Sequence, residues 1–534
     1  MYYNKGNLFE YNECVGRGMC SIFPTIASFQ EVMLIIFRTE SYYILKLEKL
    51  GTDCSLLKQN IVNGISDLIS TTGYSDEQLL DLIICNYNDL IKIRNEYLSK
   101  SKELGQSPRD IKLALKLSPE MSLSEVLSLG HKYITNKNNK MSSEQKCYSE
   151  LLFVMIKSVS LSLVKLLDYK ICSNQAVDEI IISLNTYNYT NFSIKKAEKL
   201  IKKLAEIDLE LWKERQKAQS EKFGKVSKTN VSLSTTPGKS ILVSGSSLND
   251  LYNLLEAIND DSISVYTHGD LLIAHAFKKF SEKTNLKGHF GSFNDNCLID
   301  FATFPGTILL TKHATQNIEF LIRGRLFTTD TIAPKGVVSI GTNEFEPIIT
   351  ATNIAKGFSK GRTKDSIDIG YNSEDIEEQF NLISKKFHDK EIANLFIFGT
   401  SNFTDQQTTY FESFLNALPQ NNFVISFSYQ CNCKNLLHIN VANNFPLQLD
   451  ILERLFNKIP LTAENIHFFI TKCDSNTISR MISLKEHGAK NIYLSACPPT
   501  VINPTVMNSF MKIYSIKPIT SPKTDINNII KRAL

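Results

Sequence analysis

The feature that most constrains the fold is a change in the spacing of apolar residues near residue 220. From about residue 25 to residue 218, apolar side chains recur every three or four positions, as they do on one face of a helix. The clearest stretches are Phe29–Leu50, with Gly51 as the expected C-cap, Glu150–Leu167 and Ser193–Leu211. This part of the chain is predicted to be helical.

Beyond residue 240, short apolar runs alternate with amphipathic segments. One set of expected strands is ILVSG, ISVYT and GTILLT, and a second set is LFIFG, FVISFS, HFFIT and NIYLS. This alternation is typical of parallel sheets whose strands are joined by helices. Between the two patterns, the segment Gln219–Ser240 is rich in Lys, Ser, Thr, Pro and Gly, and it is expected to be a linker or crossing loop.

These patterns together predict the fold class. We expect an N-terminal helical domain followed by two Rossmann-like α/β domains with mainly parallel sheets. The expected domains are residues 1–225, 226–373 and 374–534. Because ligands of open parallel sheets bind beyond the carboxyl ends of the strands, the residues that follow the expected strands form the candidate site.

Charge and apolar run length narrow the class of partner. The formal net charge of +4 over 534 residues gives no electrostatic case for nucleic acid or an anionic membrane. The longest apolar run near the start, Val32–Phe37, is far shorter than the ~20 residues that a membrane helix needs. We therefore expect a cytoplasmic protein whose eleven cysteines are mostly reduced. No CxxC pair occurs among them, so the commonest zinc and iron–sulfur spacings are missing.

Two short motifs need an explicit decision. The segment TTPGKS resembles a phosphate loop, but Leu233 stands where the motif needs its first glycine, and the segment precedes a strand, so we reject it. Ser247 and Asp250 form a capping pattern for the helix that follows. An anion could also rest at that helix N-terminus, but a plain capped helix is favoured.

A pair of histidines raises the question of a metal site. His268 and His275 flank Asp270. Their spacing of seven residues does not place two ligands on one face of a helix at neighbouring turns, as i and i+4 would. Hydrogen-bonded polar residues at a strand end are therefore favoured over a metal site.

Several longer blocks resemble the hybrid cluster (prismane) proteins, relatives of the nickel carbon-monoxide dehydrogenases. The blocks are ECVGRGMC near the start, ISVYTHGD, LIDFATFPGTILLT and GRLFTTDTIAPKGVVSI in the middle, and GAKNIYLSACPPTVINP near the end. The resemblance implies a four-iron cubane cluster near the N-terminus and an iron–sulfur–oxygen hybrid cluster where the domains meet. It also implies reduction of hydroxylamine or nitric oxide, with an electron donor that the sequence does not identify.

In that family a histidine, two glutamates and four cysteines hold the hybrid cluster. The histidine corresponds to Ser246, and the glutamates correspond to Asp270 and Asp474. The cysteines correspond to Ala314, Ser401, Tyr429 and a position within the cysteine-free segment Ala442–Phe445. Hydroxyl and methyl groups cannot replace soft thiolate ligands, so the standard hybrid cluster is not expected to assemble.

Two fates of the cluster pocket stay open. The first is a different metal site built from nearby thiols, carboxylates and an imidazole. Its candidate ligands are Cys431, Cys433, Cys473, Asp270, Asp474 and His313. The second, which is favoured, is a pocket repacked by Tyr429 and ordered water. A family lysine close to the second glutamate corresponds to Asn476.

The N-terminal cysteines also depart from the family pattern. Cys14 and Cys20 keep the spacing of the last two cubane ligands, but the first two ligands have no counterpart. Two chains could share one [4Fe–4S] cluster across a homodimer, as the related dehydrogenases do; otherwise the pair consists of free thiols.

Two functional hypotheses follow from these departures. In one, the chain is an oxidoreductase with altered redox chemistry. In the other, it is a catalytically inactive paralogue that acts as a binding, sensing or scaffold protein.

Overall fold

The computed structural model describes part of the chain. The described residues are 24–68, 74–186, 192–291, 297–312, 324–334, 336–399, 405–427, 435–471, 475–495 and 504–530. The chain divides into two compact units. The helical unit takes in the chain as far as Leu211, together with Asp474–Ser483 and Pro498–Ile513, and the remainder forms the α/β unit. The expected boundaries after residues 225 and 373 stay predictions.

The helical unit is built from helices with clear sequence signals. Its helices are α2 (Pro24–Lys49), α3 (Ser55–Asp67), α4 (Asp76–Glu103), α5 (Leu123–Lys140), α6 (Ser143–Leu167), α7 (Asn174–Thr186), most of α8 (Ile194–Phe223), most of α17 (Ser475–Glu486) and α18 (Pro504–Ile513). Ser75, Ser122 and Ser142 begin α4, α5 and α6 with reciprocal capping boxes. Helix α6 is buried on nearly every face, which suits the centre of a bundle.

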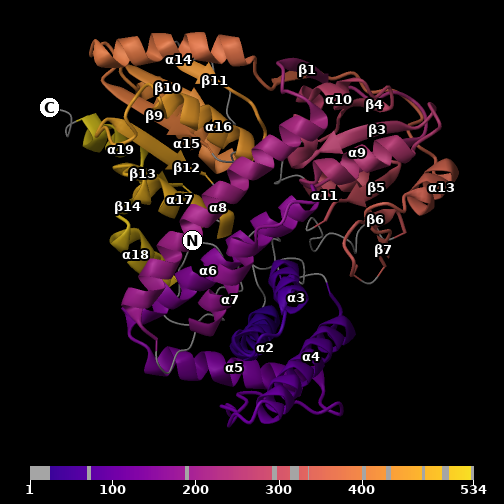
Figure 1. Cartoon of the computed structure of the whole chain (residues 1–534). Coiled ribbons are helices and arrows are strands. Elements are labelled where there is room, and N and C mark those ends of the chain that lie inside the picture. The colour runs from indigo at the N-terminus through magenta and orange to yellow at the C-terminus, as the bar shows by residue number, and fades with distance from the viewer. Residues whose placement is uncertain are drawn as a thin grey trace. The chain divides into compact units, whose positions relative to one another are not determined.

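The α/β unit holds two parallel sheets (Figure 1). The strands of the first are β2 (Ser240–Ser244), β3 (Ser264–His268), β4 (Leu286–His289), β5 (Thr307–Leu310), β6 (Leu326–Thr328) and β7 (Val338–Ser339), in the order β4-β3-β2-β5-β6-β7. The strands of the second are β9 (Asn394–Phe398), β10 (Asn422–Ser426), β11 (Leu436–His438), β12 (Ile466–Ile470), β13 (Asn491–Leu494) and β14 (Ile516–Pro518), in the order β11-β10-β9-β12-β13-β14. Each sheet starts at its centre and reverses direction once, as in Rossmann-like folds.

Helices join these strands, and one antiparallel pair forms a small sheet of its own. The helices of the first sheet are α9 (Leu248–Ala257), the 3-10 helix η2 (Gly269–Ala276), α10 (Lys278–Ser281), α11 (Cys297–Thr303) and α13 (Glu346–Ile354). Those of the second include α14 (Ser373–His388), α15 (Asp405–Ala417), α16 (Phe445–Phe456) and α19 (Pro522–Ile530). The antiparallel pair is β1 (Thr229–Ser232) with β8 (Ser366–Ile369). The predicted fold class, helices followed by mainly parallel α/β structure, is confirmed.

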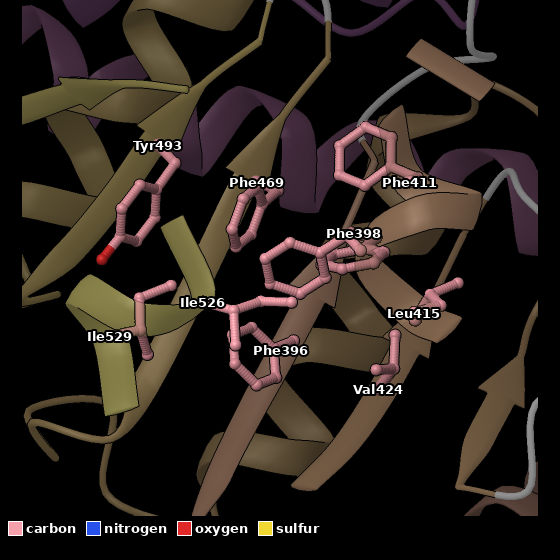
Figure 2. Packing of buried hydrophobic residues seen from close by; sticks show 10 residues of the cluster. Phe396, Phe398, Phe411, Leu415, Val424, Phe469, Tyr493, Ile526 and Ile529 are labelled. Carbon is pink, nitrogen blue, oxygen red and sulfur yellow. The ribbon is translucent and has the colours of Figure 1, made fainter. Parts of the chain in front are cut away.

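An aromatic core fixes the second sheet (Figure 2). Side chains from β9, β12 and β13 meet side chains from α15 and α19 on one face of the sheet. The ring centroids of Phe398 and Phe411 lie 4.8 Å apart, and those of Phe469 and Tyr493 also lie 4.8 Å apart. Such pairs contribute about 1 kcal/mol each beyond the area that they bury. This packing therefore fixes the positions of β9, β12 and β13 relative to α15 and α19.

The expected linker is shorter than predicted. Helix α8 continues to Phe223, because Ala218 and Phe223 are buried and the Phe223 ring packs against Tyr252 and Phe280 at centroid distances of 5.6 and 5.1 Å. Strand β1 then begins at Thr229. The linker prediction was therefore wrong at its start. The polar residues Ser220–Lys222 are helical, and the apolar side chains that stabilise this last turn come from later segments of the chain.

Candidate functional site

The candidate site begins at the carboxyl ends of β2 and β3. These strands are parallel, and Ser244 is paired with His268, an offset of 24 residues. Ser246 and Asp270 each lie two residues further along, so they leave neighbouring strands at the same level of the sheet. The spacing of 24 residues between Ser246 and Asp270 is therefore the register of the two strands.

Thr311 directly follows β5 and lies beside the end of β2, since its backbone N–H donates to the Ser244 carbonyl oxygen at 2.8 Å. Its Oγ1 accepts hydrogen bonds from the backbone N–H groups of Ser246 and Ser247 at 3.1 and 3.3 Å. These two N–H groups precede α9 and would face an anion in a nucleotide-binding fold. Because they donate to Thr311 instead, these two N–H groups are bonded to the protein's own hydroxyl group at the point where the strand order reverses.

The start of α9 is a capped helix, as the sequence favoured. Ser247 Oγ accepts from the backbone N–H of Asp250 at 3.2 Å. The Asp250 carboxylate turns to the neighbouring strand ends, where it accepts from Thr329 Oγ1 at 2.6 Å and from Lys312 N at 3.2 Å. Burial raises the pKa of Asp250 above its ordinary value, although these hydrogen bonds partly oppose the shift. The carboxylate therefore ties α9 to the ends of β5 and β6.

His268 lies between a hydroxyl group and a carboxylate. Its Nδ1 is 2.8 Å from Ser244 Oγ, and its Nε2 is 3.5 Å from Asp300 Oδ2. The ring packs against Phe301, with centroids 4.8 Å apart. Gly291, at φ +92°, leaves the room for this arrangement, since a Cβ there would lie 2.5 Å from the Asp300 carboxylate. His268 is thus hydrogen-bonded to β2, and its other ring nitrogen lies close to the Asp300 carboxylate of α11.

His275 and His289 share one threonine. Thr267 Oγ1 lies 3.0 Å from His275 Nε2 and 2.9 Å from His289 Nδ1. The single hydroxyl hydrogen of Thr267 can be donated to only one of the two rings, so at least one ring donates to the Thr267 oxygen. Burial lowers the pKa of His275 to about 4 and that of His289 well below its ordinary value. Both rings are neutral near pH 7.

No group of three or more His, Cys, Asp or Glu side chains within the described ranges is arranged to hold a metal ion. His268 and His275 engage separate hydroxyl groups, and Asp270 lies in the first turn of η2 just beyond β3. The favoured interpretation of the two histidines, hydrogen-bonded polar residues at a strand end, agrees with these contacts.

Gln407 lies at the carboxyl ends of β12 and β13 in the second sheet. Its Nε2 donates to the carbonyl oxygens of Thr471 and Ser495, both at 2.8 Å, just beyond β12 and β13. Most of the remaining predicted site residues follow strands in this region. Those that lie outside the described residues are Cys14, Cys20, His313, Ala314, Ser401, Tyr429, Cys431, Cys433, Cys473 and Asp474. Their meeting in one pocket stays a prediction.

Sequence reasoning missed a buried carboxylate in the helical unit. Asp208 accepts hydrogen bonds from Ser158, Ser162 and Ser479, each at 2.6 Å. Ser158 Oγ also lies 2.9 Å from Oδ1 of Asn476, the residue at the family's lysine position. The pair Ser158 and Ser162, four residues apart on an apolar helix, was the only signal, and it does not identify its partner.

The described part of the site does not fit an iron–sulfur cluster. Its polar atoms at the ends of β2, β3 and β5 are hydroxyl, carboxylate and imidazole groups bonded mainly to one another. The cysteine side chains that the structure describes as free thiols belong to the helical unit, and they are Cys54, Cys85, Cys147 and Cys172. Burial raises the pKa of Cys54 to about 11 and that of Cys147 to about 12, which disfavours the thiolate that binds iron.

The family model described as Prismane/CO dehydrogenase family matches residues 10–451. The hydroxylamine reductase of Acidiphilium cryptum (strain JF-5) is 22% identical over 547 residues, covering 96% of this chain and 94% of the relative. The hydroxylamine reductase of Zymomonas mobilis subsp. mobilis (strain ATCC 31821 / ZM4 / CP4) is 23% identical over 546 residues, covering 97% and 96%.

Solved structures support the same fold. An acetyl-CoA synthase/carbon monoxide dehydrogenase with NiZn[Fe4S4] and NiNi[Fe4S4] clusters aligns with a TM-score of 0.52 at 10% identity, covering 97% of this chain and 84% of that chain. The nickel-free carbon monoxide dehydrogenase of Thermococcus sp. AM4 gives a TM-score of 0.51 at 10% identity, covering 96% and 86%. At this identity the likeness concerns the fold alone. No described helix has the length and apolarity needed to span a bilayer.

Proposed function

The chain belongs to the Prismane/CO dehydrogenase family, and from that membership we propose that it is a cytoplasmic, hydroxylamine reductase-like protein that does not assemble the standard hybrid cluster. The observation that carries the proposal is Ser246. This residue follows β2, at the position that the resemblance assigns to the cluster histidine, and its backbone N–H is bonded to Thr311. A serine hydroxyl is a poor ligand for iron at neutral pH.

The other replaced positions support the same proposal. By resemblance, the thiolate positions hold Ala314, Ser401 and Tyr429, and the carboxylate positions hold Asp270 and Asp474. Aspartate is one methylene shorter than glutamate, so its reach toward a cluster is reduced. Loss of the soft ligands with retention of both acids suits a polar pocket without an iron–sulfur–oxygen cluster.

Any remaining redox centre is proposed to lie at Cys14 and Cys20. Two thiolates from each of two chains would complete one [4Fe–4S] cluster across a homodimer. When bound, such a cluster would supply one-electron transfer, and the two cysteines of each chain would hold it. The electron donor would be a separate protein or cofactor.

The alternative function is that of a catalytically inactive paralogue with a binding, sensing or scaffold role. The specific observation in its favour is internal satisfaction of the strand ends. Thr311 accepts from the backbone N–H groups that follow β2, Gln407 donates to the carbonyl oxygens that follow β12 and β13, and Thr267 bonds two buried imidazoles. A site that has lost its cofactor is expected to repack in this way.

Iron and sulfide analysis of anaerobically purified protein tests the proposal. The shared cluster predicts about four irons per two chains. The C14S and C20S variants should lose this iron and dissociate to monomers, while C85S should retain both, because Cys85 is an exposed thiol of the helical unit. Rapid hydroxylamine reduction with about eight irons per chain would overturn the proposal. Iron-free protein without such activity would favour the inactive paralogue.

A further inference from the structure

Three polar residues lie on one face of α8, in the part of the helix that belongs to the α/β unit. Arg215, Gln219 and Lys222 are spaced four and three residues apart, so their side chains share this face. Lys222 Nζ donates to Asn249 Oδ1, on α9, at 2.6 Å. Gln219 is fully buried, at 0% exposure. The face therefore combines two cations with a buried amide.

Hydrogen bonds fix the orientation of the Gln219 amide. The backbone N–H of Leu447 donates to Asn444 Oδ1 at 3.1 Å, which makes Asn444 the N-cap of α16. Asn444 must then present its Nδ2, and this nitrogen donates to Gln219 Oε1 at 3.3 Å. Gln219 Nε2 faces the other way, and this buried nitrogen donates to no described residue.

A buried amide nitrogen without an acceptor is costly, so native proteins usually provide water or a ligand at such a position. Gln219 Nε2 has only hydrogens to offer, and Arg215 and Lys222 add positive charge along the same helix face. The complementary ligand is an acceptor with negative charge. We propose that this face of α8 binds a small oxyanion, one of whose oxygens accepts a hydrogen bond from Gln219 Nε2.

The adjoining segment connects this site with the proposed function. The inference deepens the proposed function, since Asn444 lies within Ala442–Phe445, the segment to which the resemblance assigns the fourth cluster cysteine. Here the backbone is fixed by amides instead: Gln448 Nε2 donates to the Ala442 carbonyl at 3.2 Å, and Asn440 Oδ1 accepts from Ala442 N at 3.0 Å. An anion held by amides would replace a metal centre held by thiolates.

Binding of formate to the full-length protein tests the inference. Calorimetric titration and thermal unfolding would be measured with sodium formate at constant ionic strength. Formate should raise the Tm of the wild-type protein, and Gln219→Met should weaken formate binding at least tenfold. Gln219→Glu keeps an oxygen for Asn444 but places a carboxylate at the anion site, so it should abolish binding.

Gln216→Met is the matched control. Gln216 lies on the same helix, and its Nε2 already donates to Ser220 Oγ at 3.5 Å, so this variant should bind formate as the wild type does. Wild-type protein that does not bind formate would overturn the inference and assign the position to water. Undiminished formate binding by folded Gln219→Met protein would also overturn it. Iron analysis of the same samples distinguishes a failure of this inference from a failure of the proposed function. About eight irons per chain together with Gln219-dependent formate binding would contradict the proposed function and leave this inference standing.

Discussion

Gly291 shows how a single backbone position controls the histidine of the candidate site. It adopts φ +92°, and an added Cβ would lie 2.5 Å from the Asp300 carboxylate and 3.0 Å from the His268 ring. Glycine is therefore needed for two reasons, backbone conformation and space. The second reason applies specifically to the contact between His268 and Asp300.

The substitution Gly291→Ala is expected to lower the free energy of unfolding by about 3 kcal/mol, the sum of left-handed strain and overpacking. Gly324→Ala is the control, because Gly324 has φ +88° but open space around it. It should cost about 1 kcal/mol, from backbone strain alone. Urea unfolding of the two variants compares them, and equal losses would show that the Asp300 carboxylate moves away freely.

The buried histidines predict loss of stability in mild acid. Burial holds the pKa of His275 at about 4, whereas the unfolded chain takes up a proton near pH 6.5. Above pH 6.5 this burial of neutral His275 costs no stability. As the pH falls from 6.5 to about 4, protonation of the unfolded chain lowers the free energy of unfolding by about 3 kcal/mol. His275→Gln should flatten the dependence of the urea midpoint on pH between 7.5 and 5, while His388→Gln, on the surface, should not. An unchanged slope in His275→Gln would contradict this assignment.

At the scale of elements, Asp208 links α8 to α6 and α17 within the helical unit. Replacing it by alanine leaves the hydroxyls of Ser158, Ser162 and Ser479 without their acceptor. We expect a loss of about 3 kcal/mol, and a loss of about 1 kcal/mol for Asp208→Asn, which keeps an acceptor and the side-chain volume. Thermal unfolding measures both. Equal losses would mean that the charge, not the hydrogen bonds, holds these helices together.

The elements differ in how far the sequence predicts them. The strand ILVSG and helix Leu248–Ala257 were predictable because short apolar runs and capping residues are local signals. The segment between β3 and β4 forms a 3-10 helix and one short α-helix, which the apolar pattern of the sequence does not distinguish from a regular helix. Short edge strands such as β7 carry too few apolar residues to be recognised.

The site was predictable only in part, for a similar reason. Ser246 and Asp270 follow the expected strands, which the structure contains as β2 and β3, while their roles as cluster positions stay predictions. The contacts of His268 with Ser244 and Asp300 depend on strand pairing and on a distant helix, which no local pattern encodes. The oriented amide of Gln219 likewise depends on Asn444, which lies 225 residues further along the chain.

At the scale of the whole molecule, the central claim concerns how many clusters each chain carries. The family and the fold are those of proteins named for hydroxylamine reduction and carbon monoxide oxidation, while the described strand ends offer hydroxyl, carboxylate and neutral imidazole groups. The fold is therefore retained, whereas the hybrid cluster is proposed to be lost. The number of bound clusters can be determined from the mass of the intact protein.

Native mass spectrometry of protein purified without oxygen measures this number. We expect a dimer heavier than two polypeptides by one [4Fe–4S] cluster, about 350 Da, and loss of that mass in the C14S variant. A chain that carries two four-iron clusters of its own, about 700 Da or more per polypeptide, would contradict it.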